Sequence, residues 1–180
     1  MNLAKFILRL AGWKVDITAP DYAKCIVSVA PHTTNWDFIL GKLAYASVGR
    51  KAGFLMKASW FVFPFGPILR AMGGIPVERK HKTVSLTQVV NEKMKAADRM
   101  AIAITPEGTR SRVTEWHKGF LHIAHDAGVP ILLGVIDGGS KTLIIRRVFI
   151  PTGDADNDLR IIKEYYSQFT ALYPERFSTD

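Results

Sequence analysis

The amino-acid sequence predicts an α/β fold: a single domain with a mainly parallel central sheet flanked by helices, closed by a C-terminal strand hairpin. The 180 residues suffice for one sizeable core and are too few to divide comfortably into two domains. Short apolar runs rich in β-formers alternate with stretches of helical periodicity, a pattern typical of βα units. After Pro130 two strand-like runs follow each other directly, which indicates a hairpin.

The alternating elements extend from residue 25 to residue 127. Strands are expected at residues 25–30, 53–56, 74–77 and 100–104. Helices are expected at residues 35–48, 83–97 and 118–127. Strands joined through helices run parallel, so their carboxyl ends share one edge of the sheet, where α/β proteins place their ligands.

The C-terminal part is expected to add an antiparallel hairpin and a last helix. The hairpin strands are residues 131–136 and 142–150, and the glycines at 138 and 139 permit a tight reversal between them. The last helix is expected at residues 156–173. Aspartates at 154, 156 and 158 suit the positive end of its dipole.

The first fourteen residues have the pattern of a basic amphipathic helix. One face carries Leu3, Phe6, Ile7 and Leu10, and the cations Lys5, Arg9 and Lys14 lie largely off that face. Such a helix suits an anionic membrane interface, but it could equally pack on the core of its own domain. We therefore divide the chain into a membrane-associating helix, residues 1–20, and a catalytic domain, residues 21–180.

The composition excludes several classes of protein. The formal net charge of +8 implies an anionic partner, which could be nucleic acid, a bilayer or a phosphorylated substrate. Nucleic acid is not expected, because the basic residues are scattered and no recognition motif is present. No apolar run reaches the roughly 20 residues that span a bilayer. The single cysteine, Cys25, lies in an apolar run and is expected to be a buried thiol in an intracellular protein.

His32 and Asp37 are the candidate catalytic residues. His32 follows the first strand and precedes a helix whose N-cap is expected to be Thr34 or Asn35, so the helix dipole favours a neutral imidazole. Asp37 is close enough to bind one ring nitrogen and to stabilise an imidazolium. The sequence has no Gly-x-Ser-x-Gly elbow and no plausible cysteine nucleophile, so the base is expected to act on a substrate hydroxyl directly.

Other polar residues are expected at the same edge. Arg79 and Arg110 could hold a phosphate bidentately, although each alone could be a surface ion pair. Glu107 could accept hydrogen bonds from substrate hydroxyls, orient Arg110, or be only a turn residue. Lys118 could extend the positive lining of the cleft or be simply solvated.

These residues resemble four motifs of the glycerolipid acyltransferase family, which includes lysophosphatidate and glycerol-3-phosphate acyltransferases. His32 to Asp37 resembles the first motif, a histidine and an aspartate separated by four residues. The others are residues 74–79 (Gly-Ile-Pro-Val-Glu-Arg), 107–111 (Glu-Gly-Thr-Arg-Ser) and 129–131 (Val-Pro-Ile). The four lie in the family's order, and residues 21–180 are therefore expected to be an acyltransferase domain with a glycerol-3-phosphate acyltransferase-like fold.

The resemblance implies a reaction and a set of roles. His32 would be the general base on a lipid hydroxyl that attacks the thioester of acyl-CoA or of an acyl-carrier protein, and Asp37 would orient it. Arg79 and Arg110 would bind the acceptor's phosphate, Glu107 and Gly108 its polar backbone, and Pro130 would shape the acyl site. With Lys118, the expected substrate-binding set is Arg79, Glu107, Gly108, Thr109, Arg110, Lys118 and Pro130. No metal and no cofactor besides the acyl donor is expected.

The acceptor and the location follow as further expectations. A lysophospholipid such as 1-acyl-glycerol-3-phosphate fits the family, but Thr33 to Trp36 leave open a lyso-aminolipid such as an ornithine or glycine lipid. The enzyme is expected at the cytoplasmic face of a membrane, peripheral or monotopic. Its bilayer contacts would come from the N-terminal helix and from aromatic residues of the uncharged segment 58–69, namely Trp60, Phe61, Phe63 and Phe65.

Three alternatives remain open from the residues alone. One is a lipid esterase that uses Ser111 with His32, although the strained elbow that would expose this hydroxyl is missing. Another is a non-enzymatic peripheral lipid- or nucleic-acid-binding protein. The third is a metal site at His117, His122 and His125, for which no cysteine or carboxylate completes a ligand set.

Overall fold

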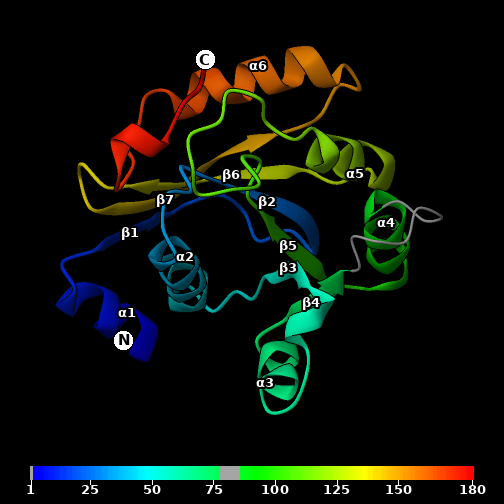
Figure 1. Ribbon diagram of the computed structural model, residues 1–180, viewed down its shortest axis with the longest axis horizontal. Helices are drawn as coiled ribbons and strands as arrows, with labels where there is room; N and C mark the ends of the chain where they lie inside the picture. The colour runs from blue at the N-terminus through cyan, green and yellow to red at the C-terminus, as the bar shows by residue number, and fades with distance from the viewer. Residues whose placement is uncertain (1, 78–85) are drawn as a thin grey trace.

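The computed structural model describes residues 2–77 and 86–180 and shows one seven-stranded sheet between two layers of helices (Figure 1). The strand order is β1-β7-β6-β2-β5-β3-β4. The strands are β1 (Lys14–Ile17), β2 (Lys24–Ala30), β3 (Gly53–Lys57), β4 (Gly74–Val77), β5 (Met100–Ile104), β6 (Ile131–Asp137) and β7 (Thr142–Phe149). The α/β class and the mainly parallel sheet are thus confirmed.

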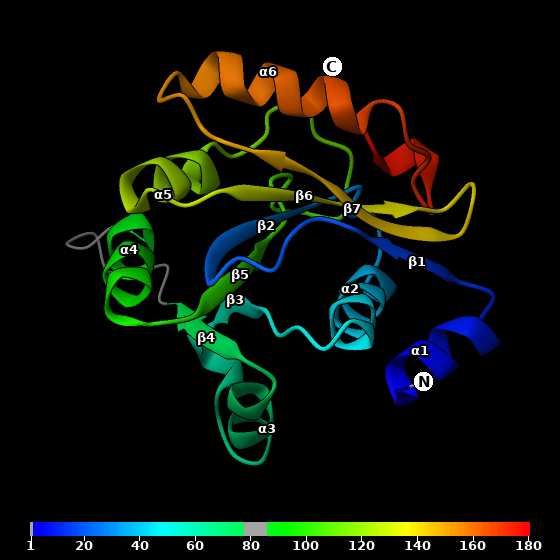
Figure 2. The same cartoon turned by 180° about the vertical axis from the view of Figure 1, so that it is seen from behind.

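Helices cover both faces of this sheet. They are α1 (Leu3–Leu10), α2 (Trp36–Ser47), α3 (Phe65–Ala71), α4 (Leu86–Ala96), α5 (Gly119–Ala127) and α6 (Ala155–Tyr166), with short 3-10 turns η1 (Ala58–Trp60) and η2 (Pro174–Arg176). Figures 1 and 2 show α5 and α6 on one face, α2 on the other, and α3 below the strands β3 and β4. Of the helices in the described part of the chain, none is long and apolar enough to cross a membrane.

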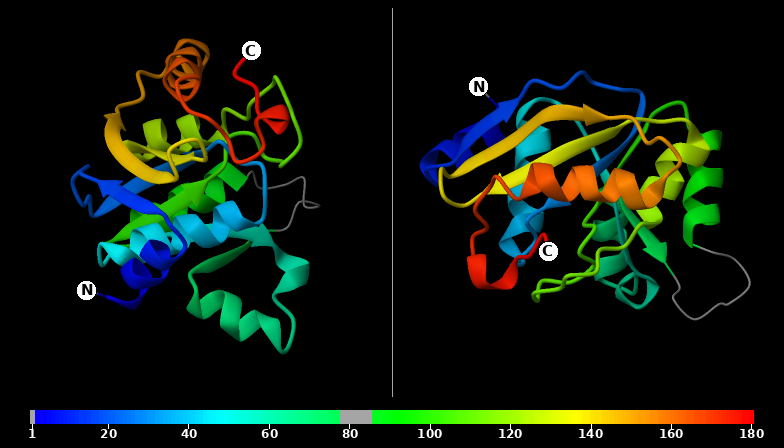
Figure 3. Two further views of the ribbon diagram at one scale, coloured as in Figure 1. Left: turned by 90° about the vertical axis from the view of Figure 1, so that its left-hand side faces the viewer. Right: turned by 90° about the horizontal axis from the view of Figure 1, so that it is seen from above.

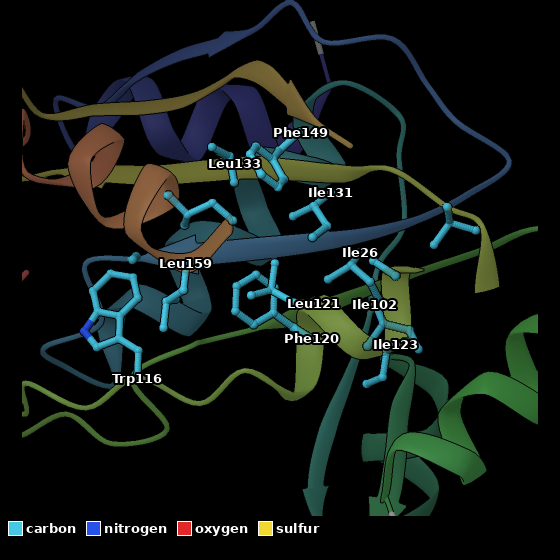
Figure 4. Close-up of a cluster of buried hydrophobic side chains, with 14 of the residues drawn as sticks. Ile26, Ile102, Trp116, Phe120, Leu121, Ile123, Ile131, Leu133, Phe149 and Leu159 are labelled. Carbon is cyan, nitrogen blue, oxygen red and sulfur yellow. The ribbon is translucent and has the colours of Figure 1, made fainter. Parts of the chain in front are cut away.

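The alternating side chains of β2 explain the two layers. Ile26 and Ala30 belong to a core shared with α4, α5 and α6, which Figure 4 shows around Phe120 and Leu159. Cys25 and Val27 belong to the core on the other face, beside α2, so Cys25 is a buried free thiol as predicted. Because successive residues of a strand point to opposite faces, a nearly continuous apolar run is what a strand buried on both faces requires.

The strand hairpin β6–β7 is antiparallel, as predicted, but its glycines serve another purpose. The positive φ in this turn belongs to Lys141, whereas neither glycine has one. A Cβ on Gly138 would lie 2.8 Å from the carbonyl oxygen of Ala171, so this glycine lets the C-terminal segment pass close by. That segment also binds the turn, since the N–H of Gly138 donates to the carbonyl of Thr170 at 2.7 Å.

This contact corrects the prediction that the last helix continues to residue 173. Helix α6 ends at Tyr166, and the chain then turns toward the hairpin. There the N–H of Thr170 donates to Oδ1 of Asp137 at 3.2 Å. A tertiary contact thus replaces the last two expected helical turns, although residues 167–173 contain no glycine or proline to end the helix.

Two features near the N-terminus were not anticipated. Residues 14–17 form strand β1, which pairs in parallel with β7. Helix α1 packs on the domain through Leu8, which is buried, while the predicted apolar face with Leu3 and Leu10 stays exposed. The side chain of Asn2 also ties α1 to the end of α2, because its Nδ2 donates to the carbonyl of Ala46 at 2.9 Å.

The segment that contains η1 and α3 projects from the sheet as an apolar unit. Trp60, Phe63 and Phe65 are exposed, as a membrane-facing role would need, and Phe63 keeps 89% of its surface. Phe61 is different from the expectation: it is buried, because Gly66 and Gly74 allow backbone and ring to approach it closely. Phe61 therefore belongs to the small core of this unit and not to its surface.

Candidate functional site

Two loops leave the carboxyl edge of the sheet side by side and carry most of the predicted site. The His32 loop (residues 31–35) follows β2, and the Glu107 loop (residues 105–118) follows β5. Their strands are parallel neighbours, with Ser28 opposite Ile104, so the two loops emerge at the same level. Figure 3 shows this edge from two further directions.

His32 and Asp37 form the pair that their spacing predicted. Nδ1 of His32 lies 3.2 Å from Oδ2 of Asp37, and only 2% of the Asp37 side chain is exposed. The same oxygen accepts the N–H groups of Thr33 at 2.6 Å and of Thr34 at 2.8 Å, which fixes the carboxylate at the start of α2. Asp37 therefore binds the loop backbone and also lies next to the imidazole ring of His32.

The contact between the two side chains is close but not yet a hydrogen bond. Within the described residues Nδ1 of His32 and Oδ1 of Asp37 are buried without a hydrogen-bond partner. A small rotation of the ring would align an Nδ1–H with the carboxylate, which would set the tautomer that leaves Nε2 free to accept a proton. Asn35 is the N-cap of α2 as expected, although its side chain makes no capping bond.

Glu107 is buried next to the His32 loop. Its Oε1 accepts the backbone N–H of His32 at 2.7 Å, and 3% of the residue is exposed. Burial raises the pKa of the Glu107 carboxyl to about 8; the bond from His32 lowers it, and the charge of Asp37 raises it further. This carboxyl faces the loop of the proposed base and neither Arg110 nor open solvent, so it orients a backbone group where the sequence suggested a substrate contact.

Gly108 and His117 are in close contact, which requires a glycine at position 108. Gly108 has a φ of +67°, and a Cβ there would lie 2.5 Å from Cδ2 of His117. The N–H of His117 also donates to the carbonyl of Pro106 at 2.8 Å. Since His117 lines the same cavity as His32, it joins the site, although the sequence singled it out only as one of three histidines of a possible metal site. Its proximity depends on how the Glu107 loop folds back, which no spacing reveals.

The remaining predicted residues are distributed unevenly. Arg110 is exposed at the cavity. Thr109 accepts the N–H of Ser111 at 3.2 Å in a local turn. Lys118 lines the cavity, but its ammonium group pairs with Asp156 on α6, so it is not a free cation of the cleft. Arg79 lies outside the described residues.

Pro130 does not join these residues. It directly precedes β6, and its carbonyl accepts the N–H of Ile26 near the start of β2. His32 comes after the end of β2, so Pro130 lies at the opposite edge of the sheet. This geometry does not support its expected part in shaping the acyl site. Pro130 precedes β6 and His32 follows the parallel strand β2, so the two residues are separated by the length of a strand.

A large, mainly apolar cavity includes His32 and Asp37 in its lining. Its volume is about 1320 Å³, and its walls come from the strands of the sheet, from α2 and from α5. The apolar wall includes Val27, Val29, Phe38, Tyr45, Phe54 and Ile136. Lys42 bridges the walls: its Nζ donates to the carbonyls of Ala52 at 2.9 Å and of Met72 at 2.7 Å. The arrangement places the partly exposed His32 and the buried Asp37 in the lining of a space that suits an extended apolar group.

The geometry also bears on two alternatives. Ser111 is exposed and is not among the residues that line the cavity, so an esterase reading has no serine beside His32. Among the described residues, no three histidine, cysteine, aspartate or glutamate side chains gather in a way that could hold a metal ion. The residues that do come together are a histidine and a carboxylate, an arrangement that is able to accept a proton from a substrate hydroxyl.

Comparison with known proteins adds an independent finding. A protein-family model described as Acyltransferase matches residues 14–135, roughly two thirds of the chain. Comparison with individually curated proteins gave no match. The matched range contains the His32 loop, the Glu107 loop and all four motifs on which the sequence resemblance rested.

We predict that Glu107 makes stability pH-dependent. Its folded pKa, about 8, lies above the ordinary value of 4.5, so the folded protein binds this proton more tightly than the unfolded chain does. The resulting stability is complete below about pH 4.5 and is lost as the pH rises through 8, on the order of 5 kcal/mol in all. Glu107→Gln keeps an acceptor and stays neutral, so urea unfolding should show a flatter pH dependence.

The matched control is Glu115→Gln, which changes an exposed glutamate of the same loop. Its unfolding free energy should follow that of the wild type from pH 5 to pH 9. Equal pH dependence in the wild type and in Glu107→Gln would contradict the buried, proton-binding state of Glu107.

Proposed function

The chain belongs to the acyltransferase family, and on that premise we propose that it acylates a lysophospholipid, such as 1-acyl-glycerol-3-phosphate, with His32 as the general base. Family membership makes the protein an enzyme that transfers an acyl group from a donor to a lipid, so the non-enzymatic alternative is wrong. The observation that carries the proposal is the His32–Asp37 pair in the lining of an apolar cavity.

The proposed reaction needs no nucleophile from the protein. Nε2 of His32 takes the proton of the acceptor hydroxyl, and the oxygen attacks the thioester carbonyl of acyl-CoA or acyl-carrier protein. The tetrahedral intermediate collapses with cleavage of the C–S bond. The leaving thiolate takes the proton from the imidazolium, which releases the acylated lipid and a free thiol. The Asp37 carboxylate, 3.2 Å from Nδ1, stabilises the imidazolium while it exists.

The surroundings of the dyad support a substrate with an apolar tail and an anionic head. The cavity beneath the sheet has space for an acyl chain, whose burial contributes about 0.8 kcal/mol per methylene. Arg110 is exposed at the cavity and forms no ion pair within the described residues, so its guanidinium is available for a phosphate. A lyso-aminolipid would use the same base and cavity without depending on Arg110, which makes Arg110 the residue that distinguishes the two acceptors.

We also propose that the enzyme acts at the cytoplasmic face of a membrane, as a peripheral or monotopic protein. The distribution of charge supports this. Residues 1–15 and 38–77 contain eight lysines and arginines and no aspartate or glutamate, while the rest of the chain contains sixteen of each sign. These two segments therefore account for the whole net charge of +8, and such a charge attracts anionic lipid headgroups.

The same two segments carry most of the exposed large apolar side chains. Helix α1 exposes Leu3 and Leu10, each with 73% of its surface, and the unit around α3 exposes Trp60, Val62, Phe63, Phe65 and Ile68. Figures 1 to 3 show α1, α2 and α3 on the same side of the sheet, opposite α6. One flat bilayer could contact both patches at once, with the helix that borders the cavity between them.

The first prediction concerns the dyad. His32→Ala should lower kcat/KM by about 10² to 10⁴ with acyl-CoA or acyl-carrier protein as donor. The reason is that no group is then positioned to take the proton from the hydroxyl of the lipid acceptor. Asp37→Asn should also lower it, since the charge that stabilises the imidazolium is lost. The control is His122→Ala, an exposed histidine on α5, which should leave transfer unchanged.

The assay is best run on paired acceptors. Transfer of radiolabelled acyl groups is measured with a lyso-acceptor that carries a phosphate and with a lyso-ornithine or lyso-glycine lipid. Arg110→Gln should raise the KM for the phosphate-bearing acceptor if that is the substrate. Undiminished transfer by His32→Ala on either acceptor would refute the proposed base.

The second prediction concerns the membrane. Phe63→Ser and Leu10→Ser should each weaken binding to liposomes with anionic headgroups, by roughly tenfold for a side chain that is largely inserted. Binding should also weaken with added salt, because the basic residues act through screened attraction. Co-sedimentation measures both effects, and transfer to a short-chain, water-soluble acceptor should not change.

Ile150→Ser is the control, since Ile150 is an exposed apolar residue outside these two patches. Its liposome binding should equal that of the wild type. If the two patch variants sedimented like the control, the proposed bilayer contact would have to be abandoned.

A further inference from the structure

The C-terminal segment 174–180 contacts both loops of the site, although it lies outside the range matched by the family. It begins with η2, which comes directly after the residues that pack against the turn of the β6–β7 hairpin. From there it reaches the His32 loop through one side chain and the Glu107 loop through its backbone.

Arg176 makes the contact with the His32 loop. Its Nη1 donates to the carbonyl of Thr33 at 3.2 Å. The N–H of Thr33 donates to Asp37, so Thr33 is held on one side by a carboxylate and on the other by a guanidinium. Thr33 is 1% exposed, so the hydrogen bond from Arg176 satisfies a carbonyl of a buried residue.

Arg176 is itself held in place. Its guanidinium lies over the ring of Tyr173, 4.7 Å from the centroid, and its Nε lies 3.8 Å from a carboxylate oxygen of Glu175. These neighbours limit the rotamers of a side chain that is otherwise half-exposed. The donor is therefore prepared for the Thr33 carbonyl before any substrate is bound.

The Glu107 loop is held by the next residues of the segment. The carbonyl of Ser178 accepts Nε1–H of Trp116 at 3.1 Å, and the ring of Phe177 lies 6.0 Å from that of Trp116. Trp116 is buried and directly precedes His117, which packs on Gly108. One short segment thus connects the loop with the proposed base to the loop with the buried glutamate.

We infer that Arg176 is a positioning residue for the His32 base, and that the C-terminal segment holds the two loops of the site in register. This inference rests on the proposed function for its kinetic consequence but not for its structural one. Without Arg176 the Thr33 peptide can move, and with it the imidazole one residue away. A displacement of about 1 Å at a reacting group can cost on the order of 10² in rate.

The experiment compares Arg176→Gln, Arg176→Lys and the control Arg160→Gln. Arg160 is an exposed arginine of α6 that contacts Asn157 and Glu164, so its loss removes a positive charge without touching either loop. Arg176→Gln should lower kcat about 10- to 100-fold and leave the KM of both substrates within twofold. Arg176→Lys keeps a charged donor and should recover part of the loss, while Arg160→Gln should behave as the wild type.

Hydrogen exchange of the Thr33 and Thr34 amides provides a readout that needs no substrate. Exchange should be faster in Arg176→Gln than in Arg160→Gln. Trp116→Phe, which loses the N–H donor together with one ring of the indole, should loosen the Glu107 loop in the same way. Unchanged exchange together with unchanged kcat would overturn the inference. A rise in KM with kcat preserved would also overturn it, because Arg176 would then be binding substrate.

The two readouts separate the possible failures. If the wild type transferred no acyl group to any acceptor, the proposed function would fail while the exchange comparison still tested the positioning role. If Arg176→Gln did not fold, Arg176→Lys and Trp116→Phe would supply the comparison. Hydrogen exchange equal to that of the wild type in both variants would then contradict the positioning role.

Discussion

Two buried carboxyl groups hold the backbone of the loop that carries His32. Asp37 accepts the N–H groups of Thr33 and Thr34, and Glu107 accepts the N–H of His32 itself. A buried carboxyl is costly unless such donors satisfy it, so each group depends on the loop as much as the loop depends on them. Because Glu107 follows β5 and His32 follows β2, this loop takes its shape only when the two strands pair in the observed register.

The unequal surroundings of these carboxyls suit the proposed chemistry. Asp37 has two N–H donors and an imidazole nitrogen beside it, whereas Glu107 has a single N–H donor and a pKa raised to about 8 by burial. A proton is thereby favoured on Glu107, the carboxyl that faces the backbone. The proposed base thus has one anionic neighbour that stabilises its imidazolium, and the apolar cavity lies directly next to it.

Local patterns were enough to predict the features that depend on local structure. The strand at 100–104 was predicted at its observed bounds, and the His32–Asp37 contact followed from a spacing that a single helical turn satisfies. Strand β1 was missed because it is only four residues long, and its alternation of charged and apolar residues begins at Lys14, inside the helical pattern of the first fourteen residues. The end of α6 was missed because its cause is a hydrogen bond to Asp137, not a helix-breaking residue.

The site was predicted less completely than the fold. The sequence placed Glu107 at the correct edge but could not show which group its carboxyl would bind, because that contact spans 75 positions and depends on strand register. The contact of Arg176 with Thr33 spans 143 positions and leaves no trace in either local pattern. Pro130 is different: it stands before a strand and not after one, so the sequence already contained the information that separates it from His32.

The central claim is that His32 activates the acceptor directly, with no acyl group ever attached to the protein. Initial rates measured while donor and acceptor concentrations are varied together test it, with intact-protein mass spectrometry after incubation with the donor alone. The account predicts intersecting double-reciprocal lines and an unmodified protein mass. Parallel lines with an acyl adduct on the chain would contradict it, because they require a nucleophile from the protein.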